Sequence, residues 1–355
     1  MYDIRVEKTT LPKQHPDEAA LGFGKYFSDH MLAIDYNGNK GWHDARIVPY
    51  SPISLDPATT SLHYGQMIFE GMKAYRTKEG KVVMFRPKEN MKRMNISAER
   101  LCMAQFDVDE QLDAIAKLVR IEENWIPSAP GTSLYVRPFM IATDPFLGIH
   151  PSDQYLFLTI LSPVGAYYAG GLAPVRIYVE PEYVRAVRGG TGFAKCAGNY
   201  AGSLLSQMKA HEQGYSQVLW LDGVERKYIE EVGAMNIFFV IDDEIVTPEL
   251  NGSILPGVTR DSVMDLLRAW GMKVSERHIS IDDLAEAYKS GSLKEVFGTG
   301  TAAVISPVGE LKYGDLVMNI NNGEIGALSQ KIYDELTGIQ KGERPDPFGW
   351  VYEVK

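Results

Sequence analysis

A lysine set among glycines is the residue of this sequence best suited to covalent chemistry. The stretch from Gly189 to Tyr200 reads GGTGFAKCAGNY and places Lys195 among four glycines and several other small residues. Because glycine carries no side chain, such a stretch keeps bulk away from the ammonium group and lets a flat ligand approach the backbone. A lysine amine is nucleophilic only when neutral, a state that desolvation or nearby positive charge favours. Lys195 is therefore a candidate for forming a Schiff base.

Two other interpretations of this stretch are a plain surface loop and a phosphate loop. A glycine-rich surface loop can carry a lysine that has no chemical role, and short motifs often match by chance. The phosphate-loop motif requires glycine directly before the lysine and a hydroxyl residue directly after it. Ala194 and Cys196 stand at those positions, which argues against a phosphate loop.

The composition predicts a soluble globular protein. The 355 residues are enough for two domains, each with its own core. Hydrophobic residues at 45% and charged residues at 23% argue against disordered and fibrous classes. The net charge of -10 disfavours nucleic acid or an anionic membrane as the main partner, because those ligands need a basic surface. A local basic pocket for a small anion stays compatible with this charge.

The sequence shows no targeting segment, and its cysteines do not form a motif. Residues 1–18 mix charges with Pro12 and Pro16 and have no apolar core, so we expect neither a secretory signal nor a membrane anchor. No later apolar run approaches the ~18 residues of a membrane span. Cys102 and Cys196 are far apart and outside any Cys-x-x-Cys or Cys/His cluster. This usage predicts a reduced, cytoplasmic protein without a structural metal site.

The chain alternates between segments of strand and helix character. In the first half we expect strands within 22–56 with a turn at 37–39, a second hairpin through 62–86, helices over 87–104 and 109–124, and strands over 134–141 and 154–161. In the second half we expect strands over 175–179, 218–221, 236–241 and 295–297, and helices over about 200–213, 263–270 and 282–288. The glycine-rich and proline-rich segment 163–174 is the expected domain boundary.

Five motifs, taken in order, carry a family resemblance. They are Phe69 to Ala74 (FEGMKA), Gly192 to Tyr200, Glu230 to Asn236, Leu255 to Arg260, and Phe297 to Ala302. Together they resemble the branched-chain amino acid aminotransferases, which use pyridoxal 5'-phosphate on the fold shared with D-amino acid aminotransferase. The likeness extends from about Gly22 to Trp350. It implies an α/β (α+β) protein with a small N-terminal domain over 1–163, a linker over 164–174 and a larger cofactor-binding domain over 175–355, with the cofactor between the domains.

The resemblance gives three residues a role toward the cofactor ring. Pyridoxal phosphate needs a lysine for its aldehyde, an acid for its pyridine nitrogen and groups that bind its phosphate. By likeness, Lys195 forms the Schiff base and moves the proton between the substrate α carbon and the cofactor C4' carbon. Glu231 pairs with the pyridinium, although the adjacent Glu230 leaves this assignment open by one position. Tyr200 reaches the phenolic oxygen. A surface glutamate and a tyrosine used in helix packing are the alternatives.

The phosphate site has a physical argument of its own. The amides of Gly257, Val258 and Thr259 precede an expected helix, whose N-terminus presents unpaired N–H groups and the positive end of the dipole. Thr299 stands between two glycines and offers a hydroxyl on a backbone that a ligand can approach closely. Arg93 matches the family's phosphate arginine, which can hold two oxygens in a fork. Its alternative role is that of a solvated charge on its helix.

For the substrate, the resemblance implies an apolar pocket with a few polar groups. The expected lining is Phe23, Tyr64, Phe69, Tyr135 and Tyr167, with Leu147 and Ile149 from the loop of a second subunit. The amides of Thr301 and Ala302 are expected to bind the α-carboxylate. Arg137, in the motif Tyr-Val-Arg-Pro, is expected to bind the second carboxylate of glutamate. Aromatic residues of plain core and a structural arginine beside a proline are the alternatives.

The activity that follows from the likeness is reversible amino transfer. Leucine, isoleucine or valine would give its amino group to 2-oxoglutarate in a ping-pong cycle, on a homodimer that needs no metal. A D-amino acid aminotransferase or an aminodeoxychorismate lyase of the same fold is an alternative that FEGMK disfavours. A binding protein in which Lys195 is only a counter-charge is the alternative from another class. Some family members carry Cys-x-x-Cys after the Gly-Thr-Ala turn, but Ala303 and Ser306 stand there, so we expect no thiol redox control.

Overall fold

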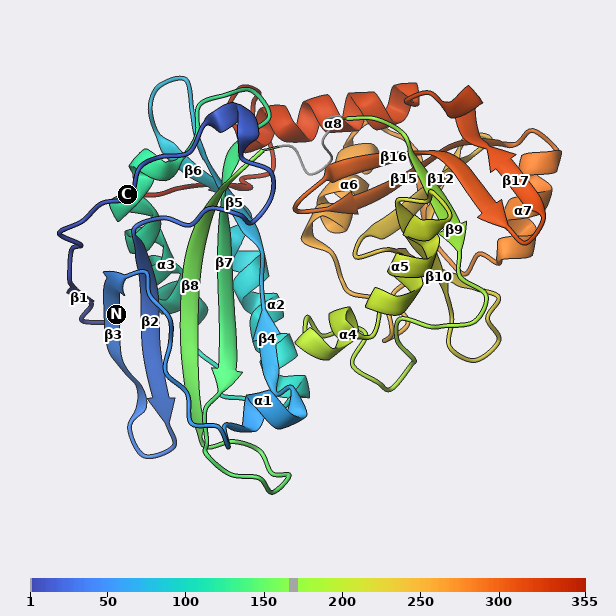
Figure 1. Ribbon diagram of the computed structural model, residues 1–355. Coiled ribbons are helices and arrows are strands. Elements are labelled where there is room, and N and C mark those ends of the chain that lie inside the picture. Colours follow the sequence, from blue (N-terminus) through green and yellow to red (C-terminus); the bar gives the residue numbers. More distant parts are fainter. Residues whose placement is uncertain (1, 166–171) are drawn as a thin grey trace. The chain divides into compact units, whose positions relative to one another are not determined.

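The computed structural model describes residues 2–165 and 172–355, which divide into two compact units (Figure 1). The first unit comprises 2–165 together with Ala194–Ala197 and Gly338–Lys355. The second comprises 172–193 and Gly198–Thr337. The single boundary that we expected at the linker does not describe this division, because two later segments of the chain belong to the first unit. The second of these segments contains β18 (Val351–Glu353), which pairs antiparallel with β6 (Val82–Phe85) and so attaches the end of the chain to the first unit.

Among its described residues, the first unit contains a nine-stranded sheet in the order β1-β3-β2-β8-β7-β5-β6-β18, with β4 paired to β7. Its further strands are β1 (Arg5–Val6), β2 (His30–Asn37), β3 (Gly41–Pro49), β4 (Met67–Phe69), β5 (Met72–Arg76), β7 (Ser133–Ala142) and β8 (Gln154–Val164). β7 and β8 pair antiparallel over ten residues, from Ser133 opposite Val164 to Ala142 opposite Tyr155. This long pairing fixes which side chains of β7 share a face.

Two amphipathic helices, α2 (Pro87–Arg100) and α3 (Val108–Ile121), cover one face of this sheet (Figure 1). Pro87 suits the first turn of α2 because it lacks the N–H that a first turn cannot satisfy. Asp107 caps α3 by accepting from the backbone N–H groups of Asp109 and Glu110. The apolar spacing of three and four therefore correctly predicted both helices.

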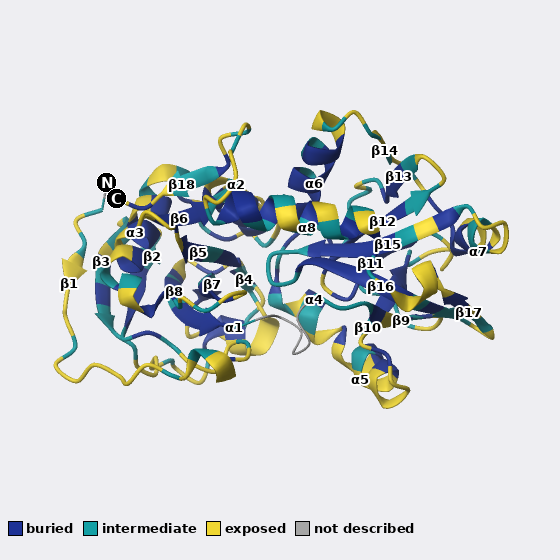
Figure 2. Cartoon of the chain, turned by 90° about the horizontal axis from the view of Figure 1, so that it is seen from above, coloured by how far each residue is buried: buried dark blue, intermediate teal, exposed yellow. Residues whose placement is uncertain are grey.

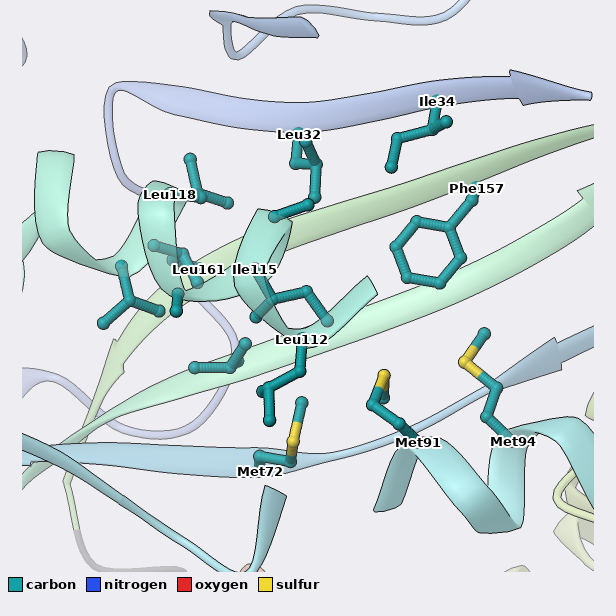
Figure 3. Packing of buried hydrophobic residues seen from close by; sticks show 14 of the residues in the cluster. Leu32, Ile34, Met72, Met91, Met94, Leu112, Ile115, Leu118, Phe157 and Leu161 are labelled. Atoms are coloured by element: carbon teal, nitrogen blue, oxygen red, sulfur yellow. The ribbon is translucent and has the colours of Figure 1, made fainter. Parts of the chain in front are cut away.

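The core of the first unit lies between these helices and the strands. Figure 3 shows Met91 and Met94 of α2, Leu112, Ile115 and Leu118 of α3, and Leu32, Ile34, Met72, Phe157 and Leu161 of the strands. All ten side chains are almost wholly removed from water. Each buried side chain of this size stabilises the fold by about 1.5–3 kcal/mol relative to an exposed one.

The second unit also contains a nine-stranded sheet among its described residues, in the order β11-β10-β9-β16-β15-β12-β13-β14, with β17 paired to β16. The strands are β9 (Val175–Val179), β10 (Gln217–Leu221), β11 (Ile229–Val232), β12 (Asn236–Ile241), β13 (Glu244–Thr247), β14 (Lys273–Glu276), β15 (Leu293–Gly300), β16 (Val304–Tyr313) and β17 (Leu316–Asn319). Figure 2 shows that buried residues follow the strands of both sheets, whereas α5 carries many exposed ones. Each sheet is thus the centre of its own unit.

The remaining helices are mostly short. They are α1 (Thr60–Tyr64), α4 (Ala197–Ala201), α5 (Leu204–Glu212), α6 (Val258–Ala269), α7 (Ile281–Lys289) and α8 (Ala327–Gln340), with the 3-10 turns η1 (Glu18–Ala20), η2 (Glu123–Trp125) and η3 (Ile320–Gly323). The single helix expected over about 200–213 is wrong, because the turn at Gly202 separates α4 from α5. Glycine is about 1 kcal/mol less favourable than alanine inside a helix. Residues from Leu62 onward, expected to lead directly into the second hairpin, begin in α1, which Gly65 ends with a left-handed φ of 64°.

Candidate active site

The backbone of Lys195 is held on both sides within the first unit. Its N–H donates to Ser97 Oγ at 2.8 Å, and its carbonyl accepts from the N–H of Phe69 at 3.1 Å. The next residue, Cys196, forms an isolated antiparallel bridge with Ile68. Lys195 Nζ lies 4.9 Å from the centre of the Phe69 ring. The lysine is therefore anchored to α2 and β4, which does not fit a loosely held surface loop.

A buried carboxylate, Glu70, lies in the same part of the first unit. Arg93 donates to it through Nε to Oε1 and through Nη2 to Oε2, both at 2.8 Å, and Asn90 Nδ2 donates to Oε2 at 2.8 Å. Burial acts to raise the pKa of Glu70, but the charges of Arg93 and Lys195 and the hydrogen bonds from Arg93 and Asn90 bring the pKa below its ordinary value. Arg93 is itself buried, so its alternative role as a solvated charge of α2 is wrong.

Arg137 and two aromatic residues form a second group on the first unit's sheet. Arg137 Nη2 donates to the Tyr135 hydroxyl at 3.0 Å, and the guanidinium carbon lies 4.8 Å from the centre of the Phe69 ring. Phe23 contacts Tyr135 edge to face, with ring centres 5.0 Å apart. Arg137 Nε is buried and has no hydrogen-bond partner among the described residues. The structure therefore brings Phe23, Phe69, Tyr135 and Arg137 together, beside Lys195.

Of the other residues predicted for the substrate pocket, Tyr64 does not join this group, and Leu147 and Ile149 were expected to reach the pocket from a second subunit. The Tyr64 hydroxyl donates to the carbonyl of Leu147, and none of the hydrogen bonds or ring contacts of Tyr64 reaches Phe69, Tyr135 or Arg137. Leu147 and Ile149 are 62% and 88% exposed in this chain. Tyr167 lies outside the described residues. Within the single chain, the pocket lining is thus only partly assembled.

Glu231 of the second unit is buried and held at both carboxylate oxygens. The N–H of Leu255 donates to Oε1 at 2.6 Å, and Arg185 Nε lies 3.2 Å from Oε2. Glu230 bonds elsewhere, accepting from Ser253 Oγ and from Asn251 Nδ2, because successive residues of strand β11 point to opposite faces. Both glutamates are buried, so the alternative of a solvated surface glutamate is wrong.

The N-terminus of α6 and Thr299 lie close together in the second unit. Gly257 is the N-cap of α6, and no side chain caps this helix end. Asn236 pairs opposite Thr299 between β12 and β15, and its Nδ2 donates to the carbonyl of Leu255 at 2.9 Å. A Cβ on Gly257 would clash with Asn236 Oδ1 in its present position, so a larger residue there would displace the Asn236 side chain. Asn236 therefore links the β12–β15 pair to the turn that begins α6.

The described groups fit pyridoxal phosphate. Thr299 Oγ1 is buried without a hydrogen-bond partner among the described residues, close to a helix end that carries no side-chain cap. An anion satisfies such an N-terminus and such a hydroxyl. Leu255 also connects this anion site to Glu231, the acid that a pyridine nitrogen requires. Thr301 and Ala302 follow in the turn between β15 and β16, within three residues of Thr299.

The glycine turn before Lys195 is organised by two residues to which the sequence analysis gave no role. Asn199 accepts from Thr191 Oγ1 at 2.7 Å and donates to the carbonyl of Thr191 at 2.8 Å. Arg185 Nη2 donates to the carbonyl of Gly192 at 3.1 Å and, with Nε near Glu231, ties this turn to the acid. Tyr200 lies half-buried in α4, one residue after Asn199. Asn199 lies within the stretch that carries Lys195, but the sequence predicted no role for it, and Arg185 lies outside every motif, since the partners of both follow from the folded turn.

The last two observations concern metal ions and membranes. Over residues 2–165 and 172–355, no group of three or more His, Cys, Asp or Glu side chains is placed to hold a metal ion. None of the helices in these same residues has both the length and the apolar character of a membrane span.

Comparison with known proteins agrees with the chemistry of these groups. The profile of the amino-transferase class IV family matches residues 67–311. The chain is 59% identical over 351 residues to branched-chain-amino-acid aminotransferase 2 of Bacillus subtilis, covering 99% of this chain and 97% of the relative. It is 58% identical to the probable branched-chain-amino-acid aminotransferase of Staphylococcus aureus strain N315, covering 98% and 97%.

Solved structures show the same two-domain fold. The branched-chain amino acid aminotransferase of Escherichia coli matches with a TM-score of 0.76 and 29% identity, over 92% of this chain and 99% of that one. The branched-chain amino acid aminotransferase of Thermoproteus uzoniensis with norvaline matches with a TM-score of 0.74 and 25% identity, over 92% and 100%. The chain therefore belongs to the class IV aminotransferases and, within them, to the branched-chain-amino-acid aminotransferases.

Proposed function

We propose that this chain catalyses reversible amino transfer between leucine, isoleucine or valine and 2-oxoglutarate, with pyridoxal phosphate as its cofactor. The observation that carries this proposal is 59% identity over 99% of the chain to a branched-chain-amino-acid aminotransferase. The same observation disfavours a D-amino acid aminotransferase, an aminodeoxychorismate lyase and a binding protein without catalysis. The products are the branched 2-oxo acid and glutamate, formed in two half-reactions.

Lys195 is the residue that performs the proton transfer. When bound, the cofactor accepts the amino group and withdraws electrons from the substrate α carbon. Lys195 Nζ would form the covalent link to the cofactor, and its free amine would be the base that moves the proton from the substrate α carbon. Glu231 keeps the ring nitrogen protonated, and Tyr200 binds the phenolic oxygen. The fixed backbone of Lys195 supports this role, because it limits where the amine can lie.

The proposed ligands of the phosphate are the amides of Gly257, Val258 and Thr259, the hydroxyl of Thr299 and the guanidinium of Arg93. Two observations on the described residues of the second unit support this set of ligands. The N-terminal end of α6 has no side-chain cap, and the hydroxyl of Thr299 has no hydrogen-bond partner among these residues. Arg93 donates hydrogen bonds to Glu70 through Nε and Nη2, and these two bonds fix the plane of its guanidinium.

The substrate side chain is proposed to contact the aromatic group of the first unit. Phe23, Phe69 and Tyr135 supply apolar surface for a branched side chain, and Tyr167 is proposed to join them. Arg137 binds the second carboxylate of glutamate or 2-oxoglutarate, while the amides of Thr301 and Ala302 bind the α-carboxylate. The contact of Phe23 with Tyr135 and the hydrogen bond from Arg137 to Tyr135 support this arrangement.

The chain is proposed to act as a homodimer in the cytoplasm. Leu62, Tyr64, Phe146, Leu147 and Ile149 are large apolar or aromatic residues that the single chain leaves exposed, and the hydrogen bond from Tyr64 to Leu147 joins α1 to the 146–149 loop. Such a patch is typical of a protein interface. Ile149→Asp should therefore convert the dimer to monomer in analytical ultracentrifugation; an unchanged dimer would place the interface elsewhere. The two free cysteines fit a reducing compartment, which cell fractionation tests.

A single experiment on purified protein tests the activity. The enzyme should be yellow with cofactor, should lose this colour on borohydride treatment, and should then carry the reduced cofactor on Lys195 in a peptide map. A panel of amino donors with 2-oxoglutarate should give the highest rates with leucine, isoleucine and valine. A label on another lysine, or a preference for D-amino acids, would refute the proposal.

A further inference from the structure

Glu70 is a buried acid for which neither the sequence motifs nor the proposed reaction supplied a role. It lies between β4 and β5, and its backbone N–H donates to the carbonyl of Pro138 at 2.8 Å. Its side chain is fully removed from water. Burying a carboxylate is costly, and replacing a buried ion pair with well-packed apolar residues is often neutral or stabilising. Stability of the fold therefore does not by itself explain why a charged group stands at this position.

One face of α2 organises both Glu70 and Lys195. Asn90, Arg93 and Ser97 stand at spacings of three and four along this helix, so their side chains lie on one side. Asn90 and Arg93 donate to Glu70, whereas Ser97 Oγ accepts from the N–H of Lys195 and donates to the carbonyl of Arg93 at 3.1 Å. The position of the lysine and the orientation of the acid are thus set by the same helix.

Three charges act on one another here. The charged groups that face Glu70 are Arg93 of α2 and Lys195 of the 194–197 segment. Neutral donors to its carboxylate are Asn90 Nδ2 and the backbone N–H of Gly71. Together these charged groups hold the pKa of Glu70 below its ordinary value, so the side chain is a carboxylate at neutral pH. Without that carboxylate, the guanidinium of Arg93 and the ammonium of Lys195 would repel each other with little solvent screening.

We propose that Glu70 is a positioning residue for the cofactor site: with Asn90 it holds the guanidinium of Arg93 in one plane for the phosphate. This inference rests on the proposed function, because Arg93 has this task only in a pyridoxal phosphate enzyme. Glu70 acts through Arg93 and is not proposed to contact the reacting atoms.

The affinities for two ligands test this role in Glu70→Gln. Apoprotein should bind pyridoxal phosphate about 10- to 150-fold more weakly, since charge-assisted hydrogen bonds that orient Arg93 are lost. Pyridoxal, which lacks the phosphate, should lose much less affinity.

Three further variants serve as controls. Glu70→Asp keeps the charge on a shorter side chain, so it should weaken the binding of pyridoxal phosphate less than Glu70→Gln does. Asn90→Ala keeps the charge but loosens the carboxylate, so it should also weaken the binding of pyridoxal phosphate more than that of pyridoxal. Glu89→Gln removes one negative charge from the solvent side of the same helix, where Glu89 pairs with Lys92, and should change neither affinity.

The outcomes distinguish this inference from the proposed function. If the unchanged protein carries borohydride-fixed cofactor on Lys195 and Glu70→Gln matches its affinity for pyridoxal phosphate within twofold, the inference is overturned and the function stands. If the unchanged protein carries no such label, the function itself fails. Should Glu70→Gln fail to fold, Glu70→Asp and Asn90→Ala decide: affinities for pyridoxal phosphate equal to that of the unchanged protein in both would overturn the inference.

Discussion

Arg137→Met tests how one pocket accepts both an apolar and an acidic side chain. Arg137 is half-buried, with its guanidinium 4.8 Å and 5.2 Å from the ring centres of Phe69 and Tyr135. Its Nη2 already donates a hydrogen bond to the Tyr135 hydroxyl, whereas its buried Nε has no hydrogen-bond partner in the described parts of the chain. A second substrate carboxylate would satisfy this N–H and pair with the charge. A leucine side chain offers no such group and would contact the rings instead.

The size of the effect follows from the hydrogen bond that is removed. Hydrogen bonds to charged groups contribute about 1.5–3 kcal/mol, which corresponds to about 10- to 150-fold in kcat/KM. Glutamate and 2-oxoglutarate should lose this much in Arg137→Met, because their second carboxylate would be buried without a cation. Leucine should change by less than about threefold, since methionine keeps apolar contact with Phe69 and Tyr135. The melting temperature should also change little, because the variant removes an unsatisfied N–H.

The assay is a pair of single half-reactions, followed by the absorbance of the cofactor, with leucine as one donor and glutamate as the other. Arg137→Lys keeps the positive charge without the fork and should fall between the two proteins for glutamate. Equal losses for leucine and glutamate would refute the reasoning. They would mean that Arg137 supports the structure of the site and that the second carboxylate binds elsewhere.

Three further predictions concern other residues. Lys195→Ala should bind the cofactor through its phosphate but lose amino transfer by more than about a thousandfold and gain no borohydride label; substantial residual turnover would sink the assignment. Glu231→Gln should slow proton transfer far more than Glu230→Gln in stopped-flow half-reactions, and the reverse order would put the pyridinium partner at the other glutamate. For Asp222, burial acts to raise the pKa, but four backbone hydrogen bonds lower it to about 2. Its carboxylate therefore stabilises the fold above pH ~4, and this contribution is lost as the pH falls toward about 2. Asp222→Asn should lower the free energy of unfolding in urea by about 1–2 kcal/mol at pH 7 and by much less near pH 2. A difference that stays constant with pH would contradict this.

The elements that the sequence predicted well are those with a local pattern. The spacing of Leu112, Ile115 and Val119 is sufficient to predict α3, because it depends only on the helix period. The break at Gly202 and the helix α1 were not predicted. Each involves only a few residues, and so short a stretch of sequence does not decide the backbone conformation. Helix α8 was not predicted, although it spans Ala327–Gln340.

The parts of the site that the sequence could not supply depend on contacts between distant residues. Strand periodicity predicts that Glu230 and Glu231 face opposite ways, but it does not say which face meets Leu255, 24 residues further on. In the same way, the FEGMKA motif marks Glu70 without revealing that Arg93, 23 residues later, binds it. Arg185 carries no motif signal at all, since its role comes from reaching Gly192 and Glu231 together.

The distribution of charge within each unit explains how an acidic protein can hold anionic ligands. The chain carries a net charge of -10, which by itself repels phosphates and carboxylates. Among the candidate residues of the first unit, however, Lys195, Arg93 and Arg137 are opposed only by Glu70. In the second unit, the carboxylate of Glu231 is matched by Arg185, and the anion site uses backbone amides and a hydroxyl, which add no net charge.

Each charge at the site thus has a separate task. The carboxylates of Glu70 and Glu231 are each matched by a buried arginine, so neither stands as an uncompensated negative charge that would repel the phosphate. Arg137 is the exception, because its hydrogen bond goes to a tyrosine hydroxyl and its Nε has no partner over the described ranges of the chain. A cation left in this state on an aromatic surface is suited to a ligand that arrives with a carboxylate in one half-reaction and without it in the other. The acceptance of both glutamate and leucine is therefore expected to depend on the incomplete pairing of Arg137.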